Sequence, residues 1–436
     1  MRFVIIIGFL LSSLTAYCQP IKTDSLVDEK AQTRHWGYEA EIQAGQVLVL
    51  DKYQKAYMKS KSDYSAAFKF NHVSLPSDSD AFAHDYHYPT FSIVGKFSKN
   101  NGATMHRDID FPHWNASDVD YYELVPYDSR LGNSFAIFGS FSYPLYRGNR
   151  WEFDICGNLG LAYSARKYDK ENCVDNDMIG SHVLFYAGGA VNATYRFAPS
   201  WGIKAGLDYW HISNGSTHQP NRSANILGPT VGIIYYPYYE TLLRERLTYT
   251  PPKFKPYWYL NFKGGVGMKT CMEDWELTQY QITKDHPDWR TENFTVYSVA
   301  SLQVDAMYRY ARIGAIGGGI DIQYNSHYAH IRDIDTSKGI DMPHHPWTIA
   351  LDAKHTLFYG NVSFALGGGI YLYKKLGDFA KRKDPIFFNR IGVHYTIPKW
   401  HNLTAGIEVK AHLTKADFTE FVVSWPIRLK AETISQ

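Results

Sequence analysis

The chain has 436 residues, of which 45% are hydrophobic and 16% aromatic, yet its mean hydropathy is only -0.34. A formal net charge of +2 gives no reason to expect a nucleic-acid partner. Beyond the first residues, no apolar run is long enough for a transmembrane helix. Such a mixture is typical of a membrane β-barrel, whose residues divide between lipid, lumen and aromatic girdles.

The N-terminus predicts a secretory signal peptide over residues 1–18. Arg2 supplies a positive charge, and a largely apolar run follows over residues 3–14. Cleavage is expected after Cys18. The mature chain would then comprise residues 19–436 and leave the cytoplasm.

Apolar and polar residues alternate along most of the remaining chain, and helical periodicity is almost absent. Residues 151–163, 387–396 and 403–413 each place an apolar row on one face and a polar row on the other. Half-buried strands of this kind are typical of a barrel wall. The predicted fold is all-β, a single closed antiparallel transmembrane β-barrel over residues 19–436. Its strand number is about 16, with roughly 12 or 14 as alternatives.

Short and long connectors alternate along this predicted barrel. Short ones are expected at 144–149, 197–200, 310–312, 358–360 and 398–401. Long polar ones are expected at 99–133, 166–181, 214–225, 269–290, 328–345 and 374–386. Outer-membrane barrels have short periplasmic turns and long external loops, which orients the chain. The stretch 238–257 is expected to be a periplasmic connector between two halves of one wall.

Residues 201–213 predict one strand of the wall. Its odd positions are apolar until a histidine, whereas its even positions include Lys204 and Asp208. The odd row is therefore expected to face lipid and the even row to face the lumen. Because side chains two apart share a face, His211 and Ser213 should lie together on the lipid side, at the external end.

His211 and Ser213 place a base beside a nucleophile. Serine alone is a poor nucleophile at neutral pH, and an adjacent imidazole steered by a third polar group is the general solution for acyl transfer. A histidine and a serine at a strand end also fit an ordinary turn, with Ser-Asn-Gly as its turn residues. Asp208 has the opposite parity and is a poor candidate for the steering group.

The segment that begins at this pair carries a resemblance to a known family. It reads His211-x-Ser213-Asn214-Gly215, then Gln219-Pro220-Asn221, then Asn225. This segment resembles the active site of the lipid A 3-O-deacylase family, also called acyloxyacyl hydrolases. The resemblance extends more diffusely over about residues 85–245. It implies an outer-membrane β-barrel esterase.

The resemblance also implies a role for each matching residue. Ser213 would be the nucleophile, His211 the base, and Asn225 the group that orients the histidine. Asn221 would donate a hydrogen bond to the oxyanion. The full set of expected oxyanion and substrate-binding residues is Asn221, Asn214, Gly215 and His182.

Asn225 departs from the deacylase pattern. The best-known deacylases carry glutamate at the orienting position, whereas asparagine is the type found in the outer-membrane phospholipase A family. That family also carries a His-x-Ser-Asn-Gly stretch. The pair Pro220-Asn221 favours the deacylase.

His182 enters through the expected strand register. If the turn at 197–200 joins two antiparallel strands, residues 184–186 lie opposite the dyad, and His182 lies close to it. A role in substrate binding is one interpretation. A solvated loop histidine at the barrel rim is the other.

The predicted function is hydrolysis of an ester-linked acyl chain of lipid A, or of a phospholipid, at the cell outer membrane by a Ser-His-Asn mechanism. No cofactor is expected. His344-His345 and Asp333-Ile334-Asp335 could make a metal site, but nothing in the sequence fixes a ligand geometry, so a solvated external loop without a metal ion is expected there. One alternative is an outer-membrane phospholipase A, dimeric and calcium-dependent. Another is a non-catalytic barrel, either a pore or a structural protein. The sequence specifies no oligomeric state.

Overall fold

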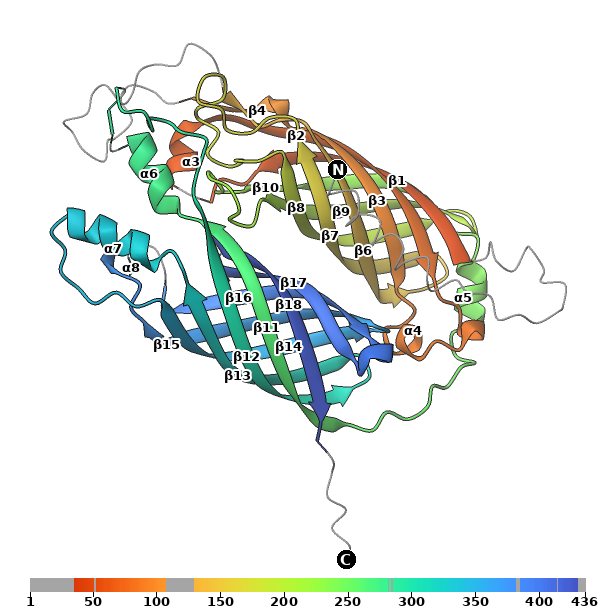
Figure 1. Ribbon diagram of the computed structural model, residues 1–436. Helices are drawn as coiled ribbons and strands as arrows, with labels where there is room; N and C mark the ends of the chain where they lie inside the picture. Colours follow the sequence, from red (N-terminus) through yellow and green to blue (C-terminus); the bar gives the residue numbers. More distant parts are fainter. Residues whose placement is uncertain are drawn as a thin grey trace, which may run out of the picture. The chain divides into compact units, whose positions relative to one another are not determined.

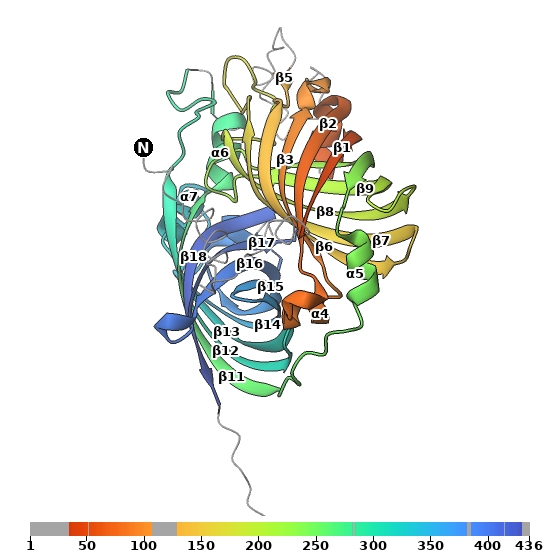
Figure 2. The same ribbon diagram turned by 90° about the vertical axis from the view of Figure 1, so that its right-hand side faces the viewer.

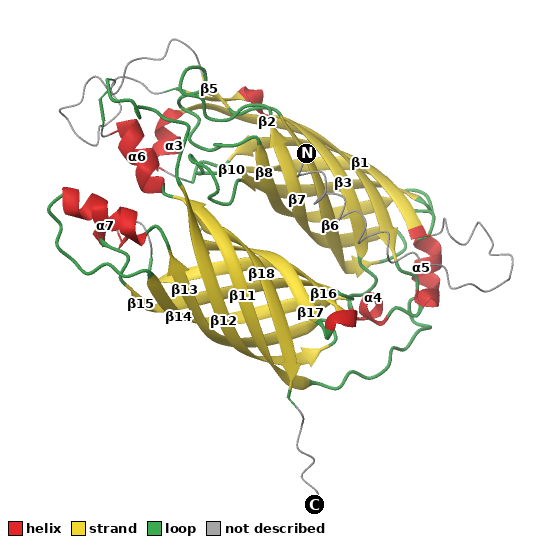
Figure 3. Ribbon diagram, viewed as in Figure 1, coloured by secondary structure: helices red, strands yellow, loops and turns green. Residues whose placement is uncertain are grey.

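The structure is a computed structural model that describes residues 35–50, 52–106, 129–280, 282–283, 285–381, 385–413 and 415–429. The predicted signal peptide, residues 1–18, lies outside these described residues. Strands account for most of the described chain, and short helices lie between them (Figure 3). None of the helices within the described ranges has the length and hydrophobicity needed to cross a membrane.

Eight strands of the N-terminal half form a closed antiparallel barrel (Figure 1). Closure comes from β1 (Trp36–Val47), which pairs with β2 along one edge and with β10 along the other. The other barrel strands are β2 (Met58–Val73), β3 (Thr90–Lys99), β6 (Ser134–Arg147), β7 (Trp151–Ser164), β8 (Val183–Arg196), β9 (Trp201–Ser213) and β10 (Ala224–Tyr235). Two short strands, β4 (Ala103–Met105) and β5 (Ser129–Arg130), continue the sheet from β2.

The C-terminal half forms a second closed barrel of eight antiparallel strands. β11 (Tyr257–Thr270) closes it by pairing with both β12 and β18. Figure 2 shows this circuit from β11 in green to β18 in dark blue. The remaining strands are β12 (Val296–Ala311), β13 (Gly314–Asn325), β14 (Trp347–Tyr359), β15 (Val362–Lys374), β16 (Phe387–Ile397), β17 (Leu403–His412) and β18 (Lys415–Arg428).

Helices occupy the connectors. They are α3 (Lys52–Tyr57), η2 (Pro76–Asp78), α4 (Ala81–Asp85), η3 (Asn100–Gly102), α5 (Tyr239–Glu245), α6 (Met272–Tyr280), α7 (Tyr328–Ser337), α8 (Asp378–Lys381) and η5 (Pro398–Trp400). α4 begins where it does because the Asp80 side chain accepts hydrogen bonds from the backbone N–H groups of Phe82 and Ala83.

The all-β, antiparallel and closed architecture and the strand number agree with the sequence prediction, but the strands divide between two barrels of eight instead of closing as one. β10 returns to pair with β1, so β11 does not join it. The connector between these two strands holds α5 and Pro251-Pro252, and proline has no N–H group for a sheet ladder. Alternation within a strand is the same in either arrangement, so it does not reveal which strands close.

Connector lengths follow the predicted asymmetry except between β2 and β3, where residues 74–89 form a long connector at the same end as the turn 197–200. β8 and β9 are joined by only residues 197–200, and β14 and β15 by residues 360–361, whereas residues 214–223 and 271–295 form long connectors at the opposite strand ends. His211 and Ser213 lie at the long-loop end of β9, as predicted.

Side chains of β9 alternate between the outside of the barrel and its lumen. Ile203 and Leu207 are 52% and 46% exposed, whereas Lys204 and Asp208 are buried. Each buried charge is paired, since Lys204 Nζ lies 2.8 Å from Glu39 Oε1 and Lys96 Nζ lies 2.8 Å from Asp208 Oδ2. An apolar outer row with a charged inner row is the pattern of a wall that faces lipid.

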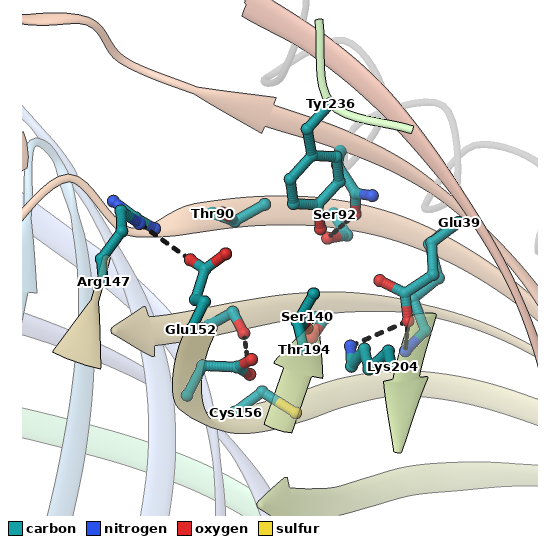
Figure 4. A pocket seen from close by; sticks show the side chains of 14 residues that line it. Glu39, Thr90, Ser92, Ser140, Arg147, Glu152, Cys156, Thr194, Lys204 and Tyr236 are labelled. Atoms are coloured by element: carbon teal, nitrogen blue, oxygen red, sulfur yellow. Dashed lines mark hydrogen bonds and ion pairs between the residues drawn. The ribbon is translucent and has the colours of Figure 1, made fainter. Parts of the chain in front are cut away.

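The lumen of the N-terminal barrel contains a polar hollow. Figure 4 shows two of its ion pairs: Arg147 with Glu152, and Lys204 with Glu39, each at 2.8 Å. Among the described residues that line this hollow, none is a predicted site residue. The hollow is therefore distinct from the surface that carries the dyad.

The lumen of the C-terminal barrel is crossed by a network around Arg390 of β16. Its guanidinium lies 2.9 Å from Asp321 Oδ2 and 3.3 Å from Glu408 Oε2, and it also pairs with Glu420. All four side chains are buried. Because a buried charge is costly without its partner, these residues depend on one another.

We expect Arg390→Met to destabilise the protein by about 3–5 kcal/mol, since it removes the guanidinium that pairs with three buried carboxylates. Urea unfolding in bilayer vesicles, followed by tryptophan fluorescence, measures this loss. Arg332→Met is the matched control, because Arg332 pairs with Asp333 on the exposed face of α7. That control should cost less than about 1 kcal/mol. Equal stability of Arg390→Met and the wild type would contradict the expectation.

Candidate active site

His211 and Ser213 form a hydrogen-bonded pair at the end of β9. The distance between His211 Nε2 and Ser213 Oγ is 3.0 Å. Both residues belong to the outward row of the strand, because side chains two apart share a face. In this geometry the Ser213 hydroxyl can donate its proton to the imidazole.

Asn225 on β10 completes the chain of hydrogen bonds. The register of the two strands sets Asn225 directly opposite His211. His211 Nδ1–H donates to Asn225 Oδ1 at 2.8 Å, and the Asn225 side chain is buried. The three residues selected from the sequence are therefore brought together in the order Asn225, His211, Ser213.

Tyr209 is a further member of the site that the sequence interpretation missed. Its hydroxyl donates to the same Asn225 Oδ1 at 2.7 Å. Tyr209 lies two residues before His211 and shares its outward face. This spacing was the feature of the sequence that could have placed Tyr209 beside the dyad. Nothing in the sequence, however, indicated that its hydroxyl reaches the neighbouring strand.

Ser223 and Tyr209 together determine which end of the Asn225 amide faces the histidine. Ser223 Oγ donates to the Arg222 carbonyl at 2.6 Å, so it can only accept from Asn225 Nδ2, at 3.5 Å. Asn225 Oδ1 therefore points toward Tyr209 and His211. Because Asn225 Oδ1 accepts a hydrogen bond from His211 Nδ1, the proton of the neutral imidazole stays on Nδ1. The unprotonated Nε2 of His211 then faces Ser213 Oγ.

The loop after Ser213 brings Asn214 and Asn221 together. Asn221 Oδ1 accepts from the backbone N–H of Asn214 at 3.0 Å, which leaves the Nδ2 end of Asn221 as its donor. Asn214 is 2% exposed, and within the described residues its buried Nδ2 has no hydrogen-bond partner. Gly215 has a left-handed backbone, with φ 63°. The loop thus collects amide donors next to Ser213.

A second loop of the same barrel supports this segment. Arg222 Nε lies 3.1 Å from Asp177 Oδ2, and both side chains are almost fully buried. The backbone N–H of Ser223 donates to the Met178 carbonyl at 3.0 Å. The residues that lead into Asn225 are therefore held against residues 177–178.

His182 has partners other than the dyad. Its Nδ1 lies 2.8 Å from the Ser164 carbonyl oxygen, and its ring stacks on Tyr163 at 5.4 Å between centroids. The predicted register is close to the observed one, in which Phe185 lies opposite Ser213. A role for His182 in substrate binding stays a prediction.

Metal-binding residue types are not gathered in the described ranges, where no group of three His, Cys, Asp or Glu side chains is placed to hold an ion. His344 Nε2 lies instead 2.7 Å from Asp335 Oδ2, a pair that links the loop to α7.

Two family models match the sequence. Residues 96–233 match the model of lipid A 3-O-deacylase, and residues 257–429 match that of the C-terminal domain of acyloxyacyl hydrolase. The chain belongs to the lipid A 3-O-deacylase, or acyloxyacyl hydrolase, family. This finding confirms the resemblance carried by the dyad segment. It makes the protein a member of a family of outer-membrane hydrolases.

No curated protein matches the chain. Among solved structures, an outer-membrane channel from Pseudomonas putida F1 shares 7% identity at a TM-score of 0.20, covering 94% of this chain and 99% of that one. The toluene transporter of Pseudomonas putida shares 8% identity at a TM-score of 0.17, covering 90% and 89%. Scores this low do not establish a shared fold.

We expect Tyr209→Phe to lower the turnover of hydrolysis about 3- to 10-fold, since it removes one hydrogen bond that orients Asn225. KM should be unchanged. The loss should shrink in an Asn225→Glu background, because a carboxylate offers an acceptor at either oxygen. Tyr195→Phe, on the outer face of β8, is the control and should leave activity intact. An equal loss in both variants would rule out a specific role for Tyr209.

Proposed function

We propose that the protein is an outer-membrane esterase that removes an ester-linked acyl chain from lipid A, with Ser213, His211 and Asn225 as its catalytic residues. One observation carries the proposal: the continuous hydrogen-bond chain from Asn225 through His211 to Ser213, on the outward face at the long-loop end of β9. Membership of the deacylase family supports lipid A as the substrate.

In the proposed reaction Ser213 Oγ attacks the ester carbonyl carbon while its proton passes to His211 Nε2. The carbonyl electron pair becomes an oxyanion. When the intermediate collapses, the ester C–O bond breaks and the departing sugar oxygen takes the proton from His211. Water then attacks the acyl-serine and gives a proton to His211. As this second intermediate collapses, the bond from Ser213 Oγ to the acyl carbon breaks, His211 returns the proton to Ser213 Oγ, and a fatty acid leaves.

The oxyanion would be stabilised by amide donors of the loop. Asn221 is the first candidate, since its Oδ1 is engaged by the Asn214 N–H and its Nδ2 remains the donor end. Asn214 Nδ2 and the backbone near Gly215 are further candidates. Donors fixed before the reaction are effective because they need no reorganisation as the negative charge develops.

The outward position of the dyad agrees with a substrate that stays in the bilayer. Leu207 and Tyr209 are exposed and precede the dyad on the same face of β9, whereas Ser213 itself is buried. Phe185 lies opposite Ser213 on β8. An acyl chain lying along this apolar surface would keep its hydrocarbon in lipid while its ester reaches Ser213. In the described residues, the inward side of the same strand end is filled by buried side chains, among them Trp210 and Ile212.

A phospholipase A of the same membrane is the second candidate, and Asn225 is the observation that favours it. An asparagine orients the histidine in that family, and the chemistry at Ser213 would be the same. In the reaction at Ser213, the two candidates differ in which ester is presented to the nucleophile.

We expect expression of the wild-type protein in a Gram-negative host to release an acyl chain from lipid A and to leave phospholipids intact. Ser213→Ala should lower the release by several orders of magnitude without unfolding the barrels, since it removes the nucleophile. Mass spectrometry of lipid A and of phospholipids measures both classes, and heat modifiability on gels reports folding. Lysophospholipid without deacylated lipid A would favour the phospholipase, and unchanged lipids would favour a non-catalytic barrel. Activity retained in Ser213→Ala would remove this residue from the mechanism.

The change Asn225→Ala should lower turnover less than His211→Ala does, because it removes the orienting group but leaves the base. Asn225→Glu should preserve or raise activity. Its pH profile should shift so that activity begins at higher pH, since a nearby carboxylate favours the charged imidazolium, which cannot act as a base. The profiles of wild type and variant are the measurement. An inactive but folded Asn225→Glu, or a fully active Asn225→Ala, would mean that another residue orients His211.

A further inference from the structure

The loop that follows Ser213 is bonded to strands of the other barrel. Thr419 of β18 donates from Oγ1 to the Gly215 carbonyl at 2.9 Å. Thr270, the last residue of β11, donates from both its backbone N–H and its Oγ1 to the Ser216 carbonyl, at 2.8 and 3.0 Å. The strand register sets Thr419 opposite Met268, so the two threonines lie at the same end of the C-terminal barrel. We call Thr270 and Thr419 the rim threonines.

Other hydrogen bonds are donated by the loop to the C-terminal barrel. Gln219 Nε2 donates to the Thr270 carbonyl at 3.1 Å, and Ser216 Oγ approaches the same oxygen at 3.5 Å. Both rim threonines are buried, as are Ser216 and Gln219. Water therefore competes little for these donors and acceptors, which makes each bond more effective than one at an exposed surface.

The bonded positions lie between the nucleophile and Asn221. A peptide plane is rigid, so fixing the Gly215 carbonyl also fixes the N–H of Ser216. Gln219 lies two residues before Asn221, whose side chain bonds back to Asn214. The rim threonines thus restrain the loop at both sides of the segment that gathers the amide donors.

Gly215 permits the close approach of the C-terminal barrel. A Cβ atom at this position would lie 2.2 Å from Thr419 Oγ1 and 3.0 Å from the Phe185 ring. The left-handed φ of 63° also favours glycine. The residue that follows Ser213-Asn214 is therefore suited both to the turn and to the contact with β18.

We propose that the rim threonines Thr270 and Thr419 are positioning residues that hold the loop of the N-terminal barrel in its catalytic conformation, so that the two barrels act as one enzyme. The proposal rests on the function proposed above. The rim threonines do not touch the reacting atoms; they act through Gly215, Ser216 and Gln219 on the donors expected to stabilise the oxyanion.

The test uses the full-length protein in vesicles that contain lipid A. Thr419→Val removes the hydroxyl at nearly constant volume and should lower kcat about 10-fold, the effect of one lost hydrogen bond, with KM within about 2-fold. Thr419→Ser keeps the donor and should restore turnover. Thr404→Val is the matched control, because the Thr404 hydroxyl bonds to Thr396 and Asn402 of its own barrel.

A second variant guards against a folding defect. Gln219→Leu removes a different bond to Thr270 and should give the same fall in kcat, with heat modifiability unchanged. An unaltered kcat in both Thr419→Val and Gln219→Leu would overturn the proposal, as would an equal loss in Thr404→Val.

Failure of the proposal can be distinguished from failure of the proposed function. If Ser213→Ala abolishes hydrolysis while the rim variants are fully active, the esterase proposal is supported and the positioning role of the rim threonines is refuted. If Ser213→Ala is fully active, the esterase mechanism itself falls and the positioning role falls with it.

Discussion

Every strand edge of a membrane barrel needs a backbone partner, because lipid offers none to N–H and C=O groups. This chain meets the requirement twice, with β1 closing on β10 and β11 closing on β18. Closure at eight strands leaves narrow lumens, which side chains fill. The ion pairs around Arg390 and Lys204 occupy that space. A site for a large amphipathic substrate is therefore expected on the outer wall.

A hydroxyl or imidazole on the outer wall has less water to bond to than one on an exposed loop, so it needs hydrogen-bond partners within the protein. The site meets this need by pairing each polar group with the next. Tyr209 and His211 both donate to Asn225 Oδ1, and Ser213 bonds to His211 Nε2. Ser223 occupies the other end of the Asn225 amide. A neutral asparagine can replace a carboxylate only while its carbonyl faces the histidine, so these flanking hydroxyls matter more here than they would beside a glutamate.

Two barrels in one chain also give the external loops something to bind. The loop after Ser213 contacts residues 177–178 of its own barrel and the rim threonines of the other. Loops are the most mobile parts of a barrel, yet oxyanion donors work best when they are fixed in advance. Support from both barrels reconciles these demands. In the proposed mechanism the C-terminal barrel therefore positions the loop of the N-terminal barrel, and it contributes none of the three proposed catalytic residues.

Alternation is a local property of a strand, so the sequence by itself determined that His211 and Ser213 face outward and that Asp208 faces inward. Loop lengths likewise determined which end of β9 carries them, and the expected register placed residues 184–186 beside the dyad. Only the tertiary structure decided that the strands close as two barrels, since either closure satisfies the same alternation. It also decided that Tyr209 reaches Asn225, 16 residues away, and that Thr419 reaches Gly215, 204 residues away. Such partners depend on register and on which edges close, and neither property is written in the local pattern of residues.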